Sequence, residues 1–291
     1  MKKIIVEVGS NNTKIHRIID KKIKFQEQIC IPFKKSYMTK GRLDEKDVRN
    51  LAVVINDLSR ETDEIFVCGT SIFRDLQENE KEIFLMTFSK LTGRDFKIIS
   101  QNEEMQLTVY GATIGLEEKA CVFIGGGGST EIAIYDKGIV EVKETSLGVI
   151  DILKEFPDLS EDIATTNIDK IKGVIKNKLN LPFEKADILI LAGGTHEKLA
   201  RFSGMKYEKN TLYDDQYAPI MVDFNTSVRE RERFFYDISL DEIRSKSDSP
   251  EWWDATRVMC AFVAVVAESI ECKYLIPTNI SMARGIIEKL L

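Results

Sequence analysis

The chain has 291 residues, of which 43% are hydrophobic and 30% are charged, and its formal net charge is -6. This length suggests one large domain or two medium-sized ones with a sizeable buried core. The acidic balance argues against a general nucleic-acid binder or a membrane-surface binder, although a local basic cluster could still hold an anionic substrate.

Cysteine and histidine usage excludes two kinds of site. The five cysteines form no C-x-x-C pair, which favours free core thiols in a reducing compartment. The two histidines, His16 and His196, are far apart in sequence, so we expect neither a histidine-rich zinc site nor a Ser-His-Asp triad. The longest apolar run, residues 258–267, is too short for a bilayer and predicts a buried helix. We therefore expect a cytoplasmic protein without a membrane partner.

The first third of the chain predicts three strands followed by alternating helices and strands. The three initial strands, joined by the loop "GSNN" and the turn "DKK", are expected over 2–8, 13–19 and 23–31. The later helices are expected over 48–60, 70–93 and 102–115, and the later strands over 64–69 and 96–100. Glu103 and Glu104 lie in the first turn of the third helix, where carboxylates suit the helix dipole.

The initial strand-loop-strand-turn-strand order recurs from residue 119. The repeated strands are expected over 119–124, 129–135 and 139–146. A gapless alignment places Gly9 on Gly126 and Asn12 on Ser129. A single repeat of this size favours gene duplication and two related domains over a solenoid. We expect these domains to span 1–116 and 117–291.

The second half is less regular than the first. A strand is expected over 186–192, a loop feeding a helix over 193–202, and helix, strand and helix over 254–271, 274–278 and 281–291. The pattern of residues 211–235 supports no assignment, and the role of 211–250 stays open.

The string "GGGGST" at 125–130 is the most unusual feature of the sequence. Glycines let a backbone approach a ligand closely, successive N–H groups can bind an anion, and hydroxyls add donors. The string is neither a Rossmann fingerprint, because a strand follows it, nor a Walker A loop, because no lysine follows it. The first repeat carries "GSNN" at the equivalent place. Two such hairpin loops, one per domain, would grip a polyphosphate across an interdomain cleft.

Seven motifs occur in one order along most of the chain: "EVGSNNTK", "TKGRLDEKDVRNLAVVINDL", "GTSIFRDLQEN", "ISQNEEMQLTVYG", "GGGGSTEIAI" with "SLGVI", "LAGGTHEKLA" and "ISMARGIIEKLL". Together they resemble the Ppx/GppA phosphatases, which hydrolyse inorganic polyphosphate or guanosine pentaphosphate and belong to the actin-like ATPase superfamily. The resemblance implies an α/β fold with two tandem RNase H-like (actin-like) domains and a site in the cleft between them.

The resemblance also implies roles for particular residues. Glu104 matches the family's catalytic carboxylate, which orients or deprotonates the attacking water, and Arg74 matches its phosphate-binding arginine. The expected metal ligands are Glu131, Glu104 and Glu7. The expected phosphate-binding residues besides Arg74 form the two loops: Gly9, Ser10 and Asn11 in the first, and Gly126, Gly127, Gly128, Ser129 and Thr130 in the second.

The chain departs from the family pattern at its expected metal site. Glu7 stands where the family usually has aspartate, and Gln101 stands where it usually has glycine. Ile124 stands where the family has an Mg²⁺-binding aspartate, and isoleucine cannot ligate a hard cation. The phosphate grip is therefore expected to be intact and the metal site weakened. We expect a slow enzyme that needs high Mg²⁺ or prefers Mn²⁺.

Three functions stay open at the level of sequence. The first is an exopolyphosphatase-like phosphohydrolase whose partner is polyphosphate or guanosine penta- or tetraphosphate. The second, motivated by Ile124, is a regulatory protein that binds such a ligand with little turnover. The third is another actin-like protein, such as a sugar kinase or acetate kinase, with "LAGGTHEKLA" in its adenosine pocket. The residues do not define the oligomeric state, and a homodimer stays open.

Overall fold

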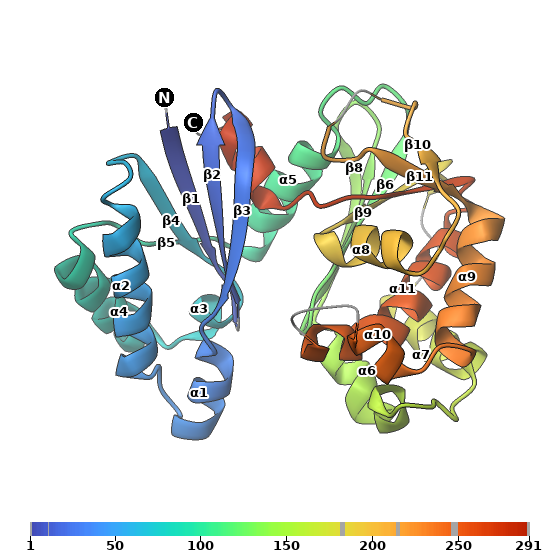
Figure 1. Cartoon of the computed structure of the whole chain (residues 1–291), viewed down its shortest axis with the longest axis horizontal. Coiled ribbons are helices and arrows are strands. Elements are labelled where there is room, and N and C mark those ends of the chain that lie inside the picture. The colour runs from blue at the N-terminus through green and yellow to red at the C-terminus, as the bar shows by residue number, and fades with distance from the viewer. Residues whose placement is uncertain (1, 11, 181–183, 214–215, 246–249, 290–291) are drawn as a thin grey trace. The chain divides into compact units, whose positions relative to one another are not determined.

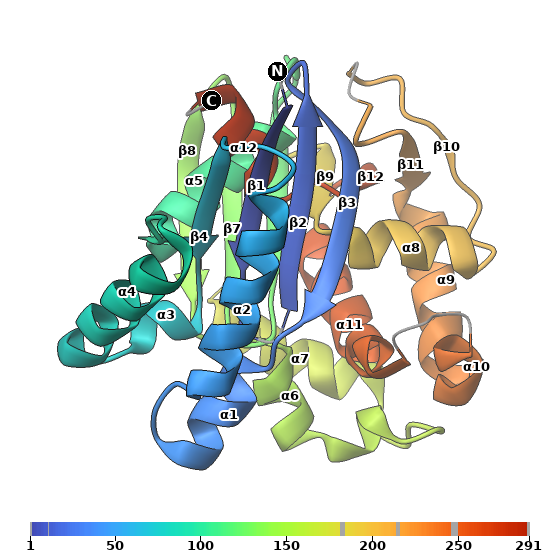
Figure 2. The same cartoon turned by 60° about the vertical axis from the view of Figure 1, so that its left-hand side comes forward.

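The computed structural model describes residues 2–10, 12–180, 184–213, 216–245 and 250–289 (Figures 1 and 2). The chain divides into two compact units. Unit 1 comprises Met1–Leu107 and Met282–Leu291, and unit 2 comprises Thr108–Ser281.

Unit 1 is built on a five-stranded sheet with the order β3-β2-β1-β4-β5. Its strands are β1 (Lys2–Val8), β2 (Asn12–Ile19), β3 (Lys22–Cys30), β4 (Ile65–Gly69) and β5 (Lys97–Ile98). Its helices are α1 (Phe33–Lys40), α2 (Glu45–Leu58), α3 (Ile72–Asp75), α4 (Glu78–Thr92), most of α5 (Gln101–Ala112), and α12 (Met282–Lys289). The first three strands are antiparallel, and β4 runs parallel to β1.

Both faces of this sheet are covered, because Ile4 to Val8 of β1 are all buried and their side chains join two different cores. Ile4, Val6 and Val8 join a core with residues of α2 and α4, while Ile5 joins a second core with residues of α5 and α12. Successive side chains of a strand point to opposite faces, so Glu7 shares the face of Ile5. In both views α2 and α4 lie on one side of the sheet and α5 and α12 on the other (Figures 1 and 2).

The helix α12 packs against α5 without room for a side chain. A Cβ added at Gly285 would lie 2.0 Å from the Leu107 carbonyl oxygen, so glycine is required at this approach. Met282, Ile286 and Ile287 fill the surrounding apolar core. The contacts of this helix place it in unit 1, although the whole of unit 2, Thr108–Ser281, separates it from the rest of unit 1 in the sequence.

Unit 2 contains a seven-stranded sheet with the order β10-β11-β12-β9-β6-β7-β8. Its strands are β6 (Ala120–Gly125), β7 (Thr130–Tyr135), β8 (Ile139–Thr145), β9 (Ile188–Ala192), β10 (Glu208–Lys209), β11 (Ile220–Asp223) and β12 (Tyr274–Pro277). Its helices are α6 (Val149–Glu155), α7 (Ile168–Leu179), α8 (Gly194–Phe202), α9 (Phe224–Tyr236), α10 (Leu240–Arg244) and α11 (Thr256–Ser269), with short 3-10 helices at Pro157–Ser160 and Pro250–Ala255.

The helix α11 forms the centre of the unit 2 core. The predicted buried run, residues 258–267, lies within it and is buried throughout. Its side chains pack with one face of β6, β7 and β9 and with α6 and α7. Among the described residues, no helix is both long and apolar enough to cross a membrane.

The predicted internal repeat is confirmed in detail. The order β3-β2-β1-β4 of unit 1 corresponds to β8-β7-β6-β9 of unit 2, with the same antiparallel and parallel pairings. The Gly9 N–H donates to the Asn12 carbonyl at 2.9 Å, and the aligned Gly126 N–H donates to the Ser129 carbonyl at 2.9 Å. The predicted α/β class with two tandem RNase H-like domains is therefore confirmed.

The two compact units differ from the predicted domains 1–116 and 117–291 in two respects. The division falls at Leu107 within α5, and residues 282–291 group with unit 1. Both differences follow from packing between residues far apart in sequence, because Leu107 shares an apolar core with Met282 and Ile286. Hydrophobic periodicity along the chain does not report such contacts.

Several predicted elements change in detail. The helix expected over 70–93 is interrupted, because the backbone of Leu76 and Gln77 is extended and the Leu76 side chain enters the core. The polar stretch before residue 48 contains an additional helix, α1. The unassigned segment 211–235 contributes β11 and α9.

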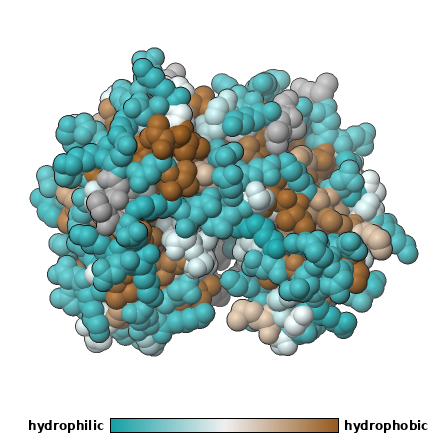
Figure 3. All heavy atoms as spheres, turned by 180° about the vertical axis from the view of Figure 1, so that it is seen from behind, coloured by the Kyte–Doolittle hydropathy of each residue, from teal (hydrophilic) through white to brown (hydrophobic). Residues whose placement is uncertain are grey.

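Exposed apolar side chains occur on the surface of both units. Figure 3 shows hydrophilic residues over most of the face that it draws, interrupted by separate hydrophobic patches. The more exposed large apolar residues include Met38, Val53, Ile83, Met86 and Ile163. Single exposed apolar residues are normal on folded proteins and by themselves require no partner.

Candidate functional site

The first predicted phosphate loop, at residues 9–12, connects β1 to β2. Besides the bond between Gly9 and Asn12, the Ser10 carbonyl accepts the Lys34 N–H at 2.8 Å. The start of α1 therefore holds this loop from outside the hairpin. Asn11, a predicted phosphate-binding residue, lies outside the described residues.

The turn between β4 and α3 lies beside this loop. The Thr70 N–H donates to the Val8 carbonyl at 3.0 Å, and the Ser10 and Ser71 hydroxyl oxygens lie 2.6 Å apart. Phe73 is fully buried among aromatic rings, including those of Phe33 and Phe96, and so fixes the short helix that carries the next residue, Arg74.

Arg74 forms an ion pair with Glu104, the predicted catalytic carboxylate. Arg74 Nη1 donates to Glu104 Oε2 at 2.5 Å and to the Ile99 carbonyl at 3.4 Å. Within the described part of the chain, Nε and Nη2 of Arg74 have no hydrogen-bond partner. The guanidinium edge formed by these two nitrogens suits bidentate binding of a phosphoryl group.

Burial and charge act in opposite directions on Glu104. Burial raises the pKa of its carboxyl above the usual range, while the hydrogen bond and the charge of Arg74 lower it. Glu7 adds a smaller raising effect on this pKa, and Lys14 a smaller lowering one. The side chain of Glu104 nevertheless keeps 33% of its surface accessible. The carboxylate is thus surrounded by charged groups of unit 1 and still open to water, as a general base must be.

The resemblance predicts that Glu104 is the general base of phosphate release. Because burial raises the pKa of Glu104, we expect the rate of phosphate release to begin to fall at a higher pH than it would with an ordinary glutamate. The carboxylate form accepts the proton, so the rate should drop as the pH falls through this raised pKa. The carboxyl group of Glu104 binds its proton more tightly in the folded state than in the unfolded state. Protonated Glu104 therefore stabilises the fold at low pH, and this contribution is lost as the pH rises through the pKa of the folded state.

The pH dependence of kcat/KM tests this expectation, with Glu104→Gln as the comparison. Wild type should show an acid limb above the usual glutamate pKa of about 4.3, and the residual rate of the variant should lack it. An identical acid limb in both proteins would assign the titration to another group.

Glu7 is buried at 8% exposure on the same sheet face as the α12 packing. Its Oε1 accepts the Ala283 N–H at 2.7 Å, and its Oε2 lies 3.5 Å from His16 Nε2. One carboxylate oxygen therefore already caps the first turn of α12. The role of Glu7 as a metal ligand stays a prediction.

The second predicted loop, at residues 126–130, connects β6 to β7. The Gly126 and Gly127 carbonyls accept the Val149 and Ile150 N–H groups at 3.1 and 2.9 Å, so the start of α6 holds this loop as α1 holds the first one. A Cβ at Gly148 would lie 2.4 Å from the Gly127 carbonyl oxygen, which explains the glycine in "SLGVI". Gly127 and Gly128 are exposed, which leaves their backbone accessible to a ligand.

Two features of this second loop bear on its predicted role in phosphate binding. Gly126, Gly127 and Gly128 are not among the glycines with positive φ, so they serve close packing and approach rather than a left-handed turn. Thr130 is 1% exposed and its hydroxyl donates to the Leu147 carbonyl at 2.8 Å. Its hydroxyl proton is thus used within the fold, whereas Ser129 remains half-buried at the loop.

Ile124 and Glu131 are direct partners in the register of β6 and β7. The equivalent partners in unit 1 are Glu7 and Lys14. Glu131 is buried and Ile124 is half-buried. At this pair of facing positions, unit 2 therefore has one carboxylate, that of Glu131, whereas unit 1 has the carboxylate of Glu7 and the amine of Lys14.

The fit of a metal ion can be tested within each unit. Among the described residues there is no group of three or more His, Cys, Asp or Glu side chains that could hold a metal ion. Glu7 caps α12 and Glu104 pairs with Arg74, so the carboxylates do not form a dedicated metal site. A Mg²⁺ ion would have to rely on one or two carboxylates, water and substrate oxygens, as it often does.

Neither histidine is arranged for catalysis. His16 is buried beside Glu7 on the sheet. His196 is 2% exposed, packs edge-on against Phe123, and has its pKa lowered to about 3 by burial and by the charge of Arg231.

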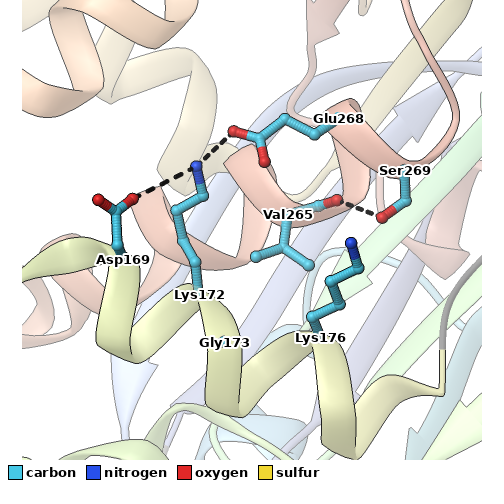
Figure 4. Close-up of a pocket in the computed structure, with 7 residues that line it drawn as sticks. All are labelled: Asp169, Lys172, Gly173, Lys176, Val265, Glu268 and Ser269. Atoms are coloured by element: carbon cyan, nitrogen blue, oxygen red, sulfur yellow. Dashed lines mark hydrogen bonds and ion pairs between the residues drawn. The ribbon is translucent and has the colours of Figure 1, made fainter.

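Unit 2 also contains a surface pocket. It is formed by α7 and α11, and its lining residues are Asp169, Lys172, Gly173, Lys176, Val265, Glu268 and Ser269 (Figure 4). Lys172 lies between two carboxylates, with Nζ 2.5 Å from Glu268 and 4.0 Å from Asp169. The charge of this lysine is paired, and none of the predicted site residues lines the pocket.

The structure thus brings together three predicted motifs within unit 1: the loop with Ser10, the turn with Arg74 and the helix start with Glu104. Sequence reasoning missed Ser71, which joins the first two. A serine before a short helix normally indicates a helix cap, and no signal in the sequence distinguishes it from one. That both phosphate loops hold one ligand stays a prediction.

The two tandem RNase H-like units define the class of the protein as one with a duplicated, actin-like fold. The model of the Ppx/GppA phosphatase family matches residues 33–233. The chain therefore belongs to the Ppx/GppA phosphatase family, and this membership supports a phosphatase-type function. A comparison with curated protein sequences finds no match.

Solved structures of this family have the same fold. The Aquifex aeolicus member of the Ppx/GppA family is 17% identical, with a TM-score of 0.79 over 100% of this chain and 97% of that chain. An exopolyphosphatase from Cytophaga hutchinsonii is 16% identical, with a TM-score of 0.79 over 100% of this chain and 97% of that chain. At these identities the likeness concerns the fold, and roles of single residues rest on the geometry above.

Proposed function

We propose that the chain hydrolyses the terminal phosphate of inorganic polyphosphate or guanosine pentaphosphate. The observation that carries this proposal is the ion pair between Arg74 and Glu104, which leaves Nε and Nη2 of Arg74 without a partner in the described structure. A fixed guanidinium edge for phosphate and an accessible carboxylate for water are the two groups that such a reaction needs.

In the proposed reaction, Arg74 holds the terminal phosphoryl group and Glu104 orients a water molecule. The water oxygen attacks phosphorus while the bond from phosphorus to the bridging oxygen breaks, and the leaving chain keeps those bonding electrons. Glu104 accepts a proton from the water. The products are orthophosphate and a chain shorter by one phosphate.

We propose that Mg²⁺ or Mn²⁺ takes part, held mainly by substrate oxygens and water, with one or two carboxylates from the predicted set of Glu104, Glu131 and Glu7. Such an ion would neutralise charge on the phosphoryl and leaving oxygens. The two loops, each fixed by the start of a following helix, are each proposed to bind phosphate oxygens through their backbone N–H groups. The cytoplasmic location and a homodimeric assembly stay predictions.

A phosphate-release assay tests the proposal. Long-chain polyphosphate, guanosine pentaphosphate and ATP are supplied separately with Mg²⁺ or Mn²⁺. Release from polyphosphate or guanosine pentaphosphate, and not from ATP, is expected. Phosphate transfer from ATP to a sugar or acetate would instead support the kinase reading. Binding of polyphosphate without release would support the second candidate, a regulatory protein, which the isoleucine at position 124 favours.

Replacing Ile124 with aspartate is expected to lower the Mg²⁺ concentration for half-maximal activity and to raise the rate. The side chain is half-buried rather than fully enclosed, so a carboxylate there can be hydrated or can meet an ion beside Glu131. Phosphate release at varied Mg²⁺, and thermal melting with and without Mg²⁺, are the measurements.

Ile124→Asn is the matched control, because asparagine has nearly the same shape as aspartate but carries no charge. A Mg²⁺-dependent gain in turnover and melting temperature for aspartate alone supports a lost metal ligand. Equal loss of stability in both variants, independent of Mg²⁺ and without a gain in turnover, would refute a metal role for this position.

A further inference from the structure

Ser71 has a backbone conformation that residues with a side chain rarely adopt. It lies between β4 and α3 with φ 53° and ψ -111°. This region is favoured by glycine, and other residues keep it only where the surrounding structure enforces it. Such strain is concentrated at functional sites, so it calls for a reason at this position.

The surrounding contacts show what this conformation achieves. The preceding Thr70 N–H is bound to the Val8 carbonyl, and the Arg74 N–H donates to the Ser71 carbonyl at 2.9 Å. Between these fixed points the Ser71 hydroxyl meets the Ser10 hydroxyl at 2.6 Å. The side chain of Ser71 makes no capping bond to the helix that it precedes. The strained residue therefore connects the first phosphate loop to the turn that carries Arg74.

The hydrogen bond between the Ser10 and Ser71 hydroxyl groups uses only one of their two protons. Each hydroxyl has one proton to donate, and the bond between Ser10 and Ser71 consumes one of the two. In the described part of the chain, neither hydroxyl has another hydrogen-bond partner. Both residues are half-buried, so one O–H remains to donate at a partly accessible position.

We propose that Ser71 is a phosphate-binding residue that acts with Ser10 as one hydroxyl pair. One hydroxyl donates to the other, and the second proton is donated to a phosphoryl oxygen held next to Arg74. The strained backbone keeps this pair in place before the ligand arrives. This inference rests on the proposed function, because it assumes that Ser10 and Arg74 bind phosphate.

Two substitutions separate the hydroxyl from the strain. Ser71→Ala removes the hydroxyl and keeps a side chain in the strained conformation, whereas Ser71→Gly removes the hydroxyl and releases the strain. Both should weaken binding of inorganic tripolyphosphate about 10- to 100-fold, the effect of one lost hydrogen bond to a charged group. Ser71→Gly should melt at a higher temperature than Ser71→Ala, because only glycine releases the strain, so a matching loss of affinity in both variants assigns that loss to the hydroxyl.

Isothermal titration calorimetry with tripolyphosphate measures the affinities, and Ser89→Ala on the exposed face of α4 is the matched control. The double variant Ser10→Ala/Ser71→Ala should bind about as weakly as either single variant, because the pair acts as a unit. Wild-type affinity of Ser71→Ala, or losses that add up fully in the double variant, would overturn the hydroxyl pair.

Arg74→Ala distinguishes failure of this inference from failure of the proposed function. If Arg74→Ala binds tripolyphosphate weakly while both Ser71 variants bind like wild type, the hydroxyl pair is wrong and the phosphate site stands. If wild type itself binds no tripolyphosphate, the proposed function and the role of Ser71 both fall.

Discussion

Replacing Glu104 with glutamine is expected to lower phosphate release by at least about tenfold, and by up to about 10²–10⁴-fold if the residue is the general base. Glutamine keeps the shape of the side chain but cannot accept the proton of the attacking water. Polyphosphate binding should stay near the wild-type level, because the Nε and Nη2 edge of Arg74 does not depend on this carboxylate. Phosphate release and calorimetric binding, measured on the same preparation, test both parts.

The adjacent Glu103 offers a matched control. It lies in the same first turn of α5 and pairs with the Lys97 amine at 2.6 Å instead of with Arg74. Glu103→Gln removes a carboxylate from the same helix and should leave hydrolysis near the wild-type rate. If Glu104→Gln hydrolyses polyphosphate as fast as Glu103→Gln does, the catalytic role is misassigned.

Replacing Arg74 with alanine is expected to weaken polyphosphate binding by about 10- to 100-fold, or more if the guanidinium binds bidentately. Arg74→Lys should recover only part of the affinity, since lysine keeps the charge but lacks the planar fork. The loss of Arg74 also removes a cation that lowers the pKa of Glu104, so the acid limb of the remaining activity should move to higher pH.

Arg60→Ala is the control for the loss of one positive charge. Arg60 is 83% exposed and pairs only with the nearby Asp57 among the ion pairs of the described residues. Its removal should change binding slightly, and that small change should disappear as salt is raised. Equal effects of Arg74→Ala and Arg60→Ala would mean that Arg74 is a solvated surface charge.

The parts of the fold that the sequence predicts best are those governed by neighbours along the chain. The alternation of β1 and the loop-strand pattern around Gly9 and Gly126 predict the duplicated hairpins, and even the hydrogen bond that closes each loop follows the alignment. The resemblance implies a role for Arg74 and for Glu104, but their ion pair could not be predicted from local patterns, because 30 residues separate the two and they lie on different helices.

The remaining features depend on contacts that no local pattern contains. Ser71 reads as a helix cap until its φ of 53° and its contact with Ser10 are known. Thr130 reads as a loop hydroxyl until the Leu147 carbonyl, from the end of the next strand, is found to accept its proton. The return of α12 to unit 1 depends on the close approach at Gly285, which periodicity cannot reveal.

The place of α12 has a consequence for biosynthesis. A ribosome releases β1 to β5 and most of α5 first, but the residues that cover one sheet face of unit 1, Met282 and those after it, emerge only after the whole of unit 2. Until then Ile5 and Leu107 lack part of their apolar cover, and the Glu7 carboxylate lacks the Ala283 N–H. Unit 2 can complete its own core earlier, because its residues are contiguous. During synthesis, the unit that carries Arg74 and Glu104 is therefore the last to complete its apolar core.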